Sequence, residues 1–284
     1  MNKILNFFSL VKFSHTIFAL PFALIGFFLA YEKTQNLDIK IFIFVIFCMI
    51  FARNSAMAFN RFIDRKIDKK NSRTKKREIP SNKISEKSAI FFIIINILLF
   101  FTTTFFINKM VFFLSPIALI IILTYSYSKR FTFFCHLILG LALSLSPIGA
   151  YLTITEKFDF LPLIFSFIVM FWVSGFDIIY SLQDENFDKK ENLHSIPVSF
   201  GKKKSLQISF IFHIITSFLV IYAGIFAKYN NFYWIGAIIF IALLFYQHKI
   251  IYENNLEKIN IIFFSKNGIA SIIFAFFTIM EIII

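Results

Sequence analysis

The chain has 284 residues, of which 58% are hydrophobic and 44 are phenylalanine, an apolar share above that of soluble domains. This composition excludes an ordinary soluble enzyme and indicates a membrane protein. The 29 lysines and arginines outnumber the 16 acids and give a formal charge of +13, which is typical of basic cytoplasmic loops and requires no nucleic acid partner.

Apolar segments of about twenty residues, the length that crosses a bilayer core, recur along the whole chain. They lie near residues 14–31, 39–61, 87–107, 110–127, 132–154, 160–182, 205–227, 232–250 and 267–284. We therefore predict an all-α, polytopic membrane protein that forms one integral-membrane domain over residues 1–284, with about nine transmembrane helices. The first segment lacks a small-residue cleavage pattern, so we interpret it as a retained helix, with a signal peptide as the alternative.

The connections between these segments differ in charge. Those after the second, fourth, sixth and eighth segments are basic, whereas the others are short and carry little net charge. By the positive-inside rule, the basic connections and the N-terminus are expected in the cytoplasm and the C-terminus outside. All the large polar connections then share one face of the membrane.

The second segment ends in the sequence FNRFIDRKID, which places Asn60, Asp64 and Asp68 at i, i+4 and i+8. At 3.6 residues per turn each step rotates by only about 40°, so the three side chains are predicted on one helix face. A solvated helix end with local pairs, such as Asp64 with Arg61, is the simpler alternative.

The sixth segment ends in a second acidic row that contains Asp177, Asp184 and Asp188. These residues also share one face if the helix continues beyond the membrane. Asp177 is expected within the membrane, where an ionisable residue is costly and marks a functional site by default. Two acidic rows at one membrane surface require a positive charge to hold them together.

Hard oxygen ligands on two opposed helices favour Mg²⁺ completed by a diphosphate. A soft metal is disfavoured because the two cysteines, Cys48 and Cys135, form no CxxC pair. The histidines are scattered, at His15, His136, His194, His213 and His248. Four basic residues near the acidic rows are candidates to bind phosphate oxygens: Arg73, Arg77, Lys129 and Arg130.

These residues resemble the UbiA-type intramembrane prenyltransferases. The sequence NRFIDRKID matches the family's NxxxDxxxD signature, and DIIYSLQDENFD matches its second signature, a leading Asp followed by DxxxD. The resemblance extends over about residues 10–205 and includes KFSHTIFALPFALIG, RTKKREIPSNKIS, LTYSYSKRFTFFCHLILGLALSLSPIGAYL and HSIPVSFGKKKS. The chain departs from the family pattern after Arg77, where Glu78 follows and Asn82 replaces a glycine. Asn tolerates a left-handed turn, so the loop is expected to keep its shape.

The resemblance implies helices arranged around a central cavity, with residues 62–86 and 183–204 forming cytoplasmic cap loops. It also implies transfer of a polyprenyl group from its diphosphate to an aromatic acceptor in the membrane of a bacterial cell. The expected metal ligands are Asn60, Asp64, Asp68, Asp177, Asp184 and Asp188, with Mg²⁺ as the cofactor. The expected catalytic residues are Asp64, Asp184 and Tyr180, and the expected diphosphate or prenyl contacts are Arg73, Arg77, Lys129, Arg130 and Tyr125.

The segment similarity favours 4-hydroxybenzoate as the acceptor, with a naphthoate for menaquinone as the alternative. Lys12 or Arg130 is a candidate for holding the acceptor's carboxylate. A lipid or ion transporter is the alternative class, because such bundles also carry intramembrane acids. The acids gather at one face and no inverted repeat is evident, which argues against a transporter. A phosphatidyltransferase would require a DGxxAR-type cluster, which the chain lacks.

Overall fold

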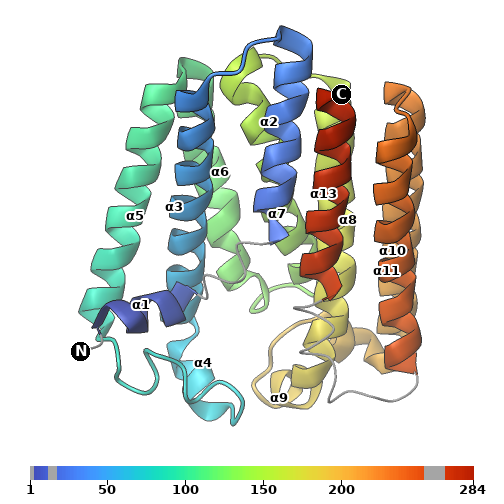
Figure 1. The fold of residues 1–284 in the computed structure, drawn as a ribbon. Coiled ribbons are helices and arrows are strands. Elements are labelled where there is room, and N and C mark those ends of the chain that lie inside the picture. The colour runs from blue at the N-terminus through green and yellow to red at the C-terminus, as the bar shows by residue number, and fades with distance from the viewer. Residues whose placement is uncertain (1–2, 12–17, 253–265) are drawn as a thin grey trace.

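The computed structural model describes residues 3–11, 18–252 and 266–284, and every regular element in these ranges is a helix. Long helices stand side by side, while the short α1, α4 and α9 gather at the end where the N-terminus lies, with the C-terminus at the other end (Figure 1). The long helices are α2 (Leu20–Thr34), α3 (Ile39–Ile63), α5 (Glu86–Ile107), α6 (Lys109–Ser128), α7 (Cys135–Thr155), α8 (Phe160–Ser181), α10 (Ile196–Ala227), α11 (Asn231–Tyr252) and α13 (Asn267–Ile283). The short elements are α1 (Lys3–Val11), α4 (Arg65–Lys70), the 3₁₀ turn η2 (Leu182–Asp184) and α9 (Glu185–Lys190).

Within the described residues, seven helices are long and apolar enough to cross a membrane, namely α3, α5, α6, α7, α8, α10 and α11. Helices α2 and α13, of 15 and 17 residues, fall short of that length. The all-α polytopic fold is therefore confirmed, and the expected number of about nine spans is approximate. Helix α2, which lies within the first predicted segment, begins at Leu20 with Pro21 in its first turn, where a missing N–H costs nothing.

Several long helices begin at residues whose side chains accept hydrogen bonds from the first turn. Asp38 caps α3, Ser85 caps α5, Asn108 caps α6 and Ser195 caps α10. Such caps satisfy backbone N–H groups that have no partner within the helix. The Ser195 side chain thus serves as the N-cap of α10.

The main hydrophobic core lies between α2, α7, α8, α10, α11 and α13, around the fully buried Trp172, Phe22 and Phe240. Helices α2 and α7 approach closely because Gly26 has no side chain. A Cβ atom at Gly26 would lie 2.0 Å from the Pro147 carbonyl oxygen. This contact fixes α2 against the wall of the cavity described below.

A second hydrophobic cluster anchors the connection between α4 and α5. Its buried residues are Leu10, Ala58, Ile79, Ile84, Ala89 and Ile93, from α1, α3, the connection and α5. Asn82 adopts φ 59°, the left-handed conformation expected where the family has glycine. The Glu78 carboxylate accepts a hydrogen bond of 2.5 Å from the Ser9 hydroxyl of α1. The two departures in this loop therefore leave it folded over the end of the bundle.

Candidate active site

The first acidic motif lies where α3 ends and α4 begins. Asp64 occupies the break between these helices, so the three motif residues do not share one uninterrupted helix as expected. The backbone N–H groups of Asp64 and Asp68 nevertheless bond to the carbonyls of Asn60 and Asp64, which keeps the i, i+4 spacing. The Asn60 amide donates to the Asp64 carboxylate at 3.2 Å. The polar stripe therefore persists through the break.

The second motif passes through three elements. Asp177 lies in α8, Asp184 closes the 3₁₀ turn η2, and Asp188 lies in α9. The change to 3₁₀ geometry alters the predicted alignment of Asp177 with the other two carboxylates, because a 3₁₀ turn has a shorter repeat. Lys70 at the end of α4 bonds to Glu191 at 2.6 Å, which brings the two motif-bearing segments together.

Two arginines of the loop after α4 face carboxylates of both motifs. The Arg77 guanidinium donates to both oxygens of Asp68, at 2.7 and 2.8 Å. Arg73 forms a bidentate pair with Asp184 and donates to the Tyr180 hydroxyl at 3.0 Å. Burial alone would lower the pKa of Arg73, but the Asp184 carboxylate outweighs it and the pKa lies above its usual value. Arg73 is thus fully charged in the site.

The two basic residues after α6 face the remaining carboxylates. Arg130 donates to Asp64 at 3.1 Å, and the Lys129 ammonium lies 3.6 Å from Asp188. Burial would lower the pKa of Lys129, but the Asp188 carboxylate raises it above its usual value. Burial raises the pKa of Asp64 despite the Arg130 contact. Asp64 therefore pairs with Arg130 and not with Arg61, the partner that a simple helix end would use.

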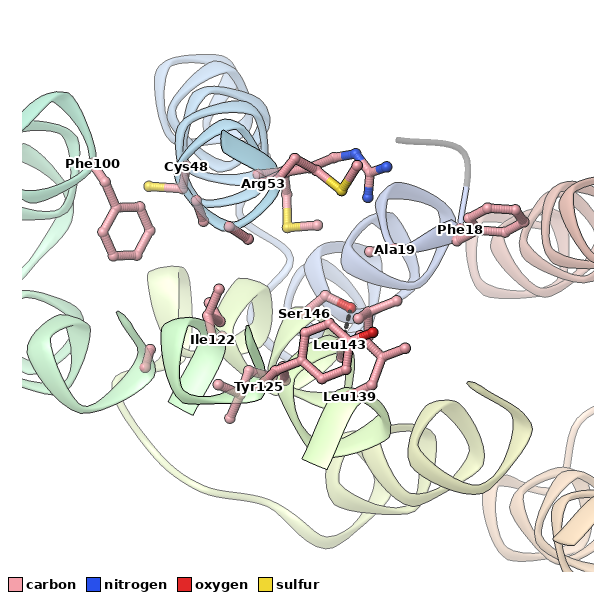
Figure 2. Close-up of a pocket in the computed structure, with 18 of the residues that line it drawn as sticks. Phe18, Ala19, Cys48, Arg53, Phe100, Ile122, Tyr125, Leu139, Leu143 and Ser146 are labelled. Carbon is pink, nitrogen blue, oxygen red and sulfur yellow. Dashed lines mark hydrogen bonds between the residues drawn. The ribbon is translucent and has the colours of Figure 1, made fainter. Parts of the chain in front are cut away.

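A cavity of about 360 Å³ leads from these ion pairs into the bundle. Its polar end is formed by Asn60, Arg77, Asp177 and Tyr180, and its apolar walls come mainly from α3, α5, α6 and α7. Tyr125 points from α6 toward Leu139 and Leu143, as Figure 2 shows. The structure thus joins a charged mouth to an apolar interior.

Two arginines that sequence reasoning did not select also line this cavity, Arg53 and Arg61. Figure 2 shows Arg53 extending from α3 toward Ala19 and the start of α2. Among the described residues neither arginine has a hydrogen-bond or ion-pair partner, and the Nε of each is buried. The sequence did contain an indication for Arg53, because an ionisable residue inside an apolar segment is energetically costly and marks a functional site by default. An unpaired cation in such a cavity is suited to an anionic ligand.

Asp177 has a different kind of partner from the other acids. Its Oδ2 lies 2.7 Å from the Nδ1 of His136, a histidine that sequence reasoning left without a role.

Other residues named from the sequence lie elsewhere. Lys12 and His15 are outside the residues that the structure describes. Tyr127 lies against Phe59 and Arg130, with its ring centroid 5.8 Å from that of Phe59.

The side chains at the mouth offer oxygen donors of the kind that a hard cation prefers. Within the described ranges, no group of three His, Cys, Asp or Glu side chains is close enough to hold a metal by itself. The ligands available are carboxylates and an amide, and the Asp188 Oδ2 atom is buried without a hydrogen bond. Such a set suits Mg²⁺ only if other oxygens complete its octahedron.

Comparison with known proteins adds independent findings. The model of the UbiA prenyltransferase family matches residues 19–272. A 4-hydroxybenzoate octaprenyltransferase of Francisella tularensis subsp. tularensis (strain SCHU S4) is 30% identical over 216 residues, which cover 76% of this chain and 75% of that protein. The same enzyme of Shewanella halifaxensis is 27% identical over 215 residues, covering 76% and 75%.

Solved structures agree on the fold. A UbiA homolog from Aeropyrum pernix K1 superposes with a TM-score of 0.86 at 26% identity, covering 94% of this chain and 98% of that one. A homolog from Archaeoglobus fulgidus, solved with GPP and Mg²⁺, gives 0.73 at 21% identity, covering 98% and 100%. The fold and these matches define an integral-membrane prenyltransferase. The chain belongs to the UbiA prenyltransferase family.

Proposed function

We propose that this prenyltransferase moves a polyprenyl group from its diphosphate to the ring carbon ortho to the hydroxyl of 4-hydroxybenzoate, with Mg²⁺ as cofactor, in quinone biosynthesis. A dihydroxynaphthoate is the alternative acceptor. The names of the relatives support the first choice, because they are 4-hydroxybenzoate octaprenyltransferases.

The observation that carries the proposal is the pairing of four carboxylates with four cations at the cavity mouth. The pairs are Asp64–Arg130, Asp68–Arg77, Asp184–Arg73 and Asp188–Lys129. A diphosphate attracts the cations, since arginine forks match phosphate oxygens. The released carboxylates then need cations of their own. The mouth is therefore complementary to a metal–diphosphate complex and not to either component alone.

Asn60, Asp64, Asp68, Asp184 and Asp188 would hold the metal, with the diphosphate supplying the remaining oxygens. The Oδ2 of Asp188 supports this role, because it is buried without a hydrogen bond and has only the Lys129 ammonium, at 3.6 Å, as a partner. When bound, Mg²⁺ would offset the charge of the departing diphosphate and so favour breaking of the allylic C–O bond. The A. fulgidus homologs solved with Mg²⁺ and GPP or DMAPP provide a parallel.

The apolar walls give the prenyl chain and its cation a dry environment. The rings of Tyr125, Phe176 and Tyr180 line the cavity, and ring faces attract cations within about 6 Å. Tyr180 also accepts a hydrogen bond from Arg73, which fixes its position beside the leaving group. Exclusion of water favours capture of the cation by the acceptor over hydrolysis.

Arg53 is our candidate for holding the acceptor's carboxylate. It lies seven residues before Asn60 on α3, about two turns farther into the membrane at roughly 1.5 Å per residue. An unpaired guanidinium there is unfavourable without an anion, and a benzoate supplies one. We prefer Arg53 to Arg130 for this role, because Arg130 pairs with Asp64 and is assigned here to the diphosphate, while the other candidate, Lys12, lies outside the described residues.

We further propose that the mouth faces the cytoplasm of a bacterial cell, with the enzyme in the inner membrane. The loop after α4 and the helix α9, which form the mouth, are rich in lysine and lie at one end of the bundle (Figure 1). Under the positive-inside rule this end is cytoplasmic.

Acceptor identity is tested by incubating membranes that contain the protein with a polyprenyl diphosphate, Mg²⁺ and one acceptor at a time. The panel comprises 4-hydroxybenzoate, dihydroxynaphthoates, homogentisate and haem, and mass spectrometry reads the lipid extract. We expect a prenylated product with 4-hydroxybenzoate. A product only with a naphthoate would move the enzyme to menaquinone synthesis, and no product from folded protein would contradict prenyl transfer to these aromatic acceptors.

A further inference from the structure

A buried histidine–aspartate pair lies at the polar end of the cavity and takes part in none of the four ion pairs at the mouth. Asp177 of α8 is 7% exposed and lines the cavity, and its Oδ2 contacts the Nδ1 of the fully buried His136 of α7 at 2.7 Å. Among the described residues no hydrogen bond engages the other carboxylate oxygen, Oδ1. One oxygen of Asp177 is thus fixed and the other is free.

The surroundings of His136 place a proton between the ring and Asp177. The backbone N–H of Ile196 lies 3.4 Å from Nε2, and Nδ1, on the other side of the ring, donates its proton to the Asp177 carboxylate. The Ser174 hydroxyl donates to the His136 carbonyl at 3.1 Å and ties the start of α7 to α8. A histidine held in this way orients an ionised carboxylate, as an orienting partner does in other proton-transfer sites.

Asp177 is separated along the chain from the proposed metal ligands of its own motif. It precedes Asp184 by seven residues, roughly 10 Å along the helix at about 1.5 Å per residue. The mouth acids each face arginine or lysine, whereas Asp177 faces the imidazole ring of His136. It lies on α8, and Arg53 lies on α3, another wall of the same cavity.

The proposed reaction, on which this inference rests, needs a group with these properties. When the C–O bond of the diphosphate breaks, the leaving group takes the electron pair, and a ring carbon of the acceptor bonds to the allylic cation. That carbon still carries its hydrogen, and the aromatic ring is restored only when this proton leaves and the C–H electrons return to the ring. A carboxylate in a dry cavity is a suitable acceptor for the proton.

We propose that Asp177 is the general base that removes the ring proton after the carbon–carbon bond forms, and that His136 is its positioning residue. Oδ1 takes the proton, while Oδ2 stays bonded to Nδ1–H of His136. The proton passes to water when the product leaves. Asp177 thereby has a different role from the metal ligand that its place in the motif suggested.

The test compares ordinary 4-hydroxybenzoate with the ring-deuterated compound in the purified enzyme and in Asp177→Asn. We expect Asp177→Asn to form product about 10²- to 10⁴-fold more slowly, the usual contribution of a general base. A deuterium isotope effect should appear in the variant, because C–H cleavage becomes limiting, while the Mg²⁺ concentration for half-maximal rate stays unchanged. Equal rates with both compounds, or a raised Mg²⁺ requirement, would overturn the proposal.

His136→Gln and His136→Leu provide a second measurement that does not depend on folding of the first variant. Glutamine keeps an N–H donor toward Asp177, and leucine removes it. We expect an isotope effect with leucine, a smaller one with glutamine, and unchanged KM for the prenyl diphosphate in both. Loss of rate without an isotope effect in His136→Leu would show that the pair is only structural. Product formation by the unmodified enzyme tests the prenyl-transfer function separately.

Discussion

Replacing Asp64 with Asn is expected to reduce prenyl transfer by about 10²-fold or more, the scale of losing one preorganised electrostatic contact to a developing charge. Asparagine keeps the shape of the side chain and can still accept a hydrogen bond from Arg130. The substitution removes the ligand charge that Mg²⁺ needs and leaves the break between α3 and α4 intact. Initial rates with an allylic diphosphate, 4-hydroxybenzoate and excess Mg²⁺ measure the effect, and Asp184→Asn should behave in the same way.

Asp38→Asn is the matched control for this experiment. Asp38 caps the opposite end of α3 by accepting from the backbone N–H groups of Lys40 and Ile41. Asparagine caps helices equally well, so folding and rate should stay unchanged. Turnover by Asp64→Asn at the rate of the unmodified enzyme would refute the assignment of the metal site.

Replacing Arg53 with Met is expected to raise the KM for 4-hydroxybenzoate by about 10²- to 10³-fold, while the KM for the prenyl diphosphate stays unchanged. This range corresponds to roughly 3–4 kcal/mol, the lower part of the loss found when one partner of a buried ion pair is removed. The ligand-free variant should also unfold at a higher temperature, because Arg53 has no ion-pair partner among the described residues and its Nε is buried without a hydrogen bond. Steady-state kinetics with each substrate varied, together with thermal unfolding in detergent, measure both effects.

Lys40→Met, at the other end of α3, removes a cation outside the cavity and should change neither KM. If Arg53→Met raised the KM for the diphosphate and not for the acceptor, Arg53 would belong to the phosphate site. Unchanged KM values for both substrates would remove Arg53 from the binding site altogether.

Local spacing predicted the parts of the site that depend on one helix. The i, i+4 pattern of Asn60, Asp64 and Asp68 survives in the structure, although the helix breaks at Asp64. The left-handed conformation of Asn82 also follows from its own chemistry. Such features were predictable because their causes lie within a few residues.

Contacts between distant segments were not predictable in the same way. His136 and Asp177 are 41 residues apart, and Arg73 and Asp184 are 111 apart. Spacing along one helix does not define the packing of α7 on α8 or the fold of the cap over the mouth. The role of Arg53 depends on a cavity that several helices form together. Its position inside an apolar segment was the only local signal.

The central claim is that the chain couples release of diphosphate to prenylation of an aromatic acid. The most direct measurement uses the purified protein with Mg²⁺, an allylic diphosphate and 4-hydroxybenzoate, and counts released diphosphate and prenylated product together. We predict equal amounts of both, neither without the acceptor, and loss of both when a chelator removes the metal. Folded protein that releases no diphosphate in any mixture, or releases it without forming product, would contradict this account.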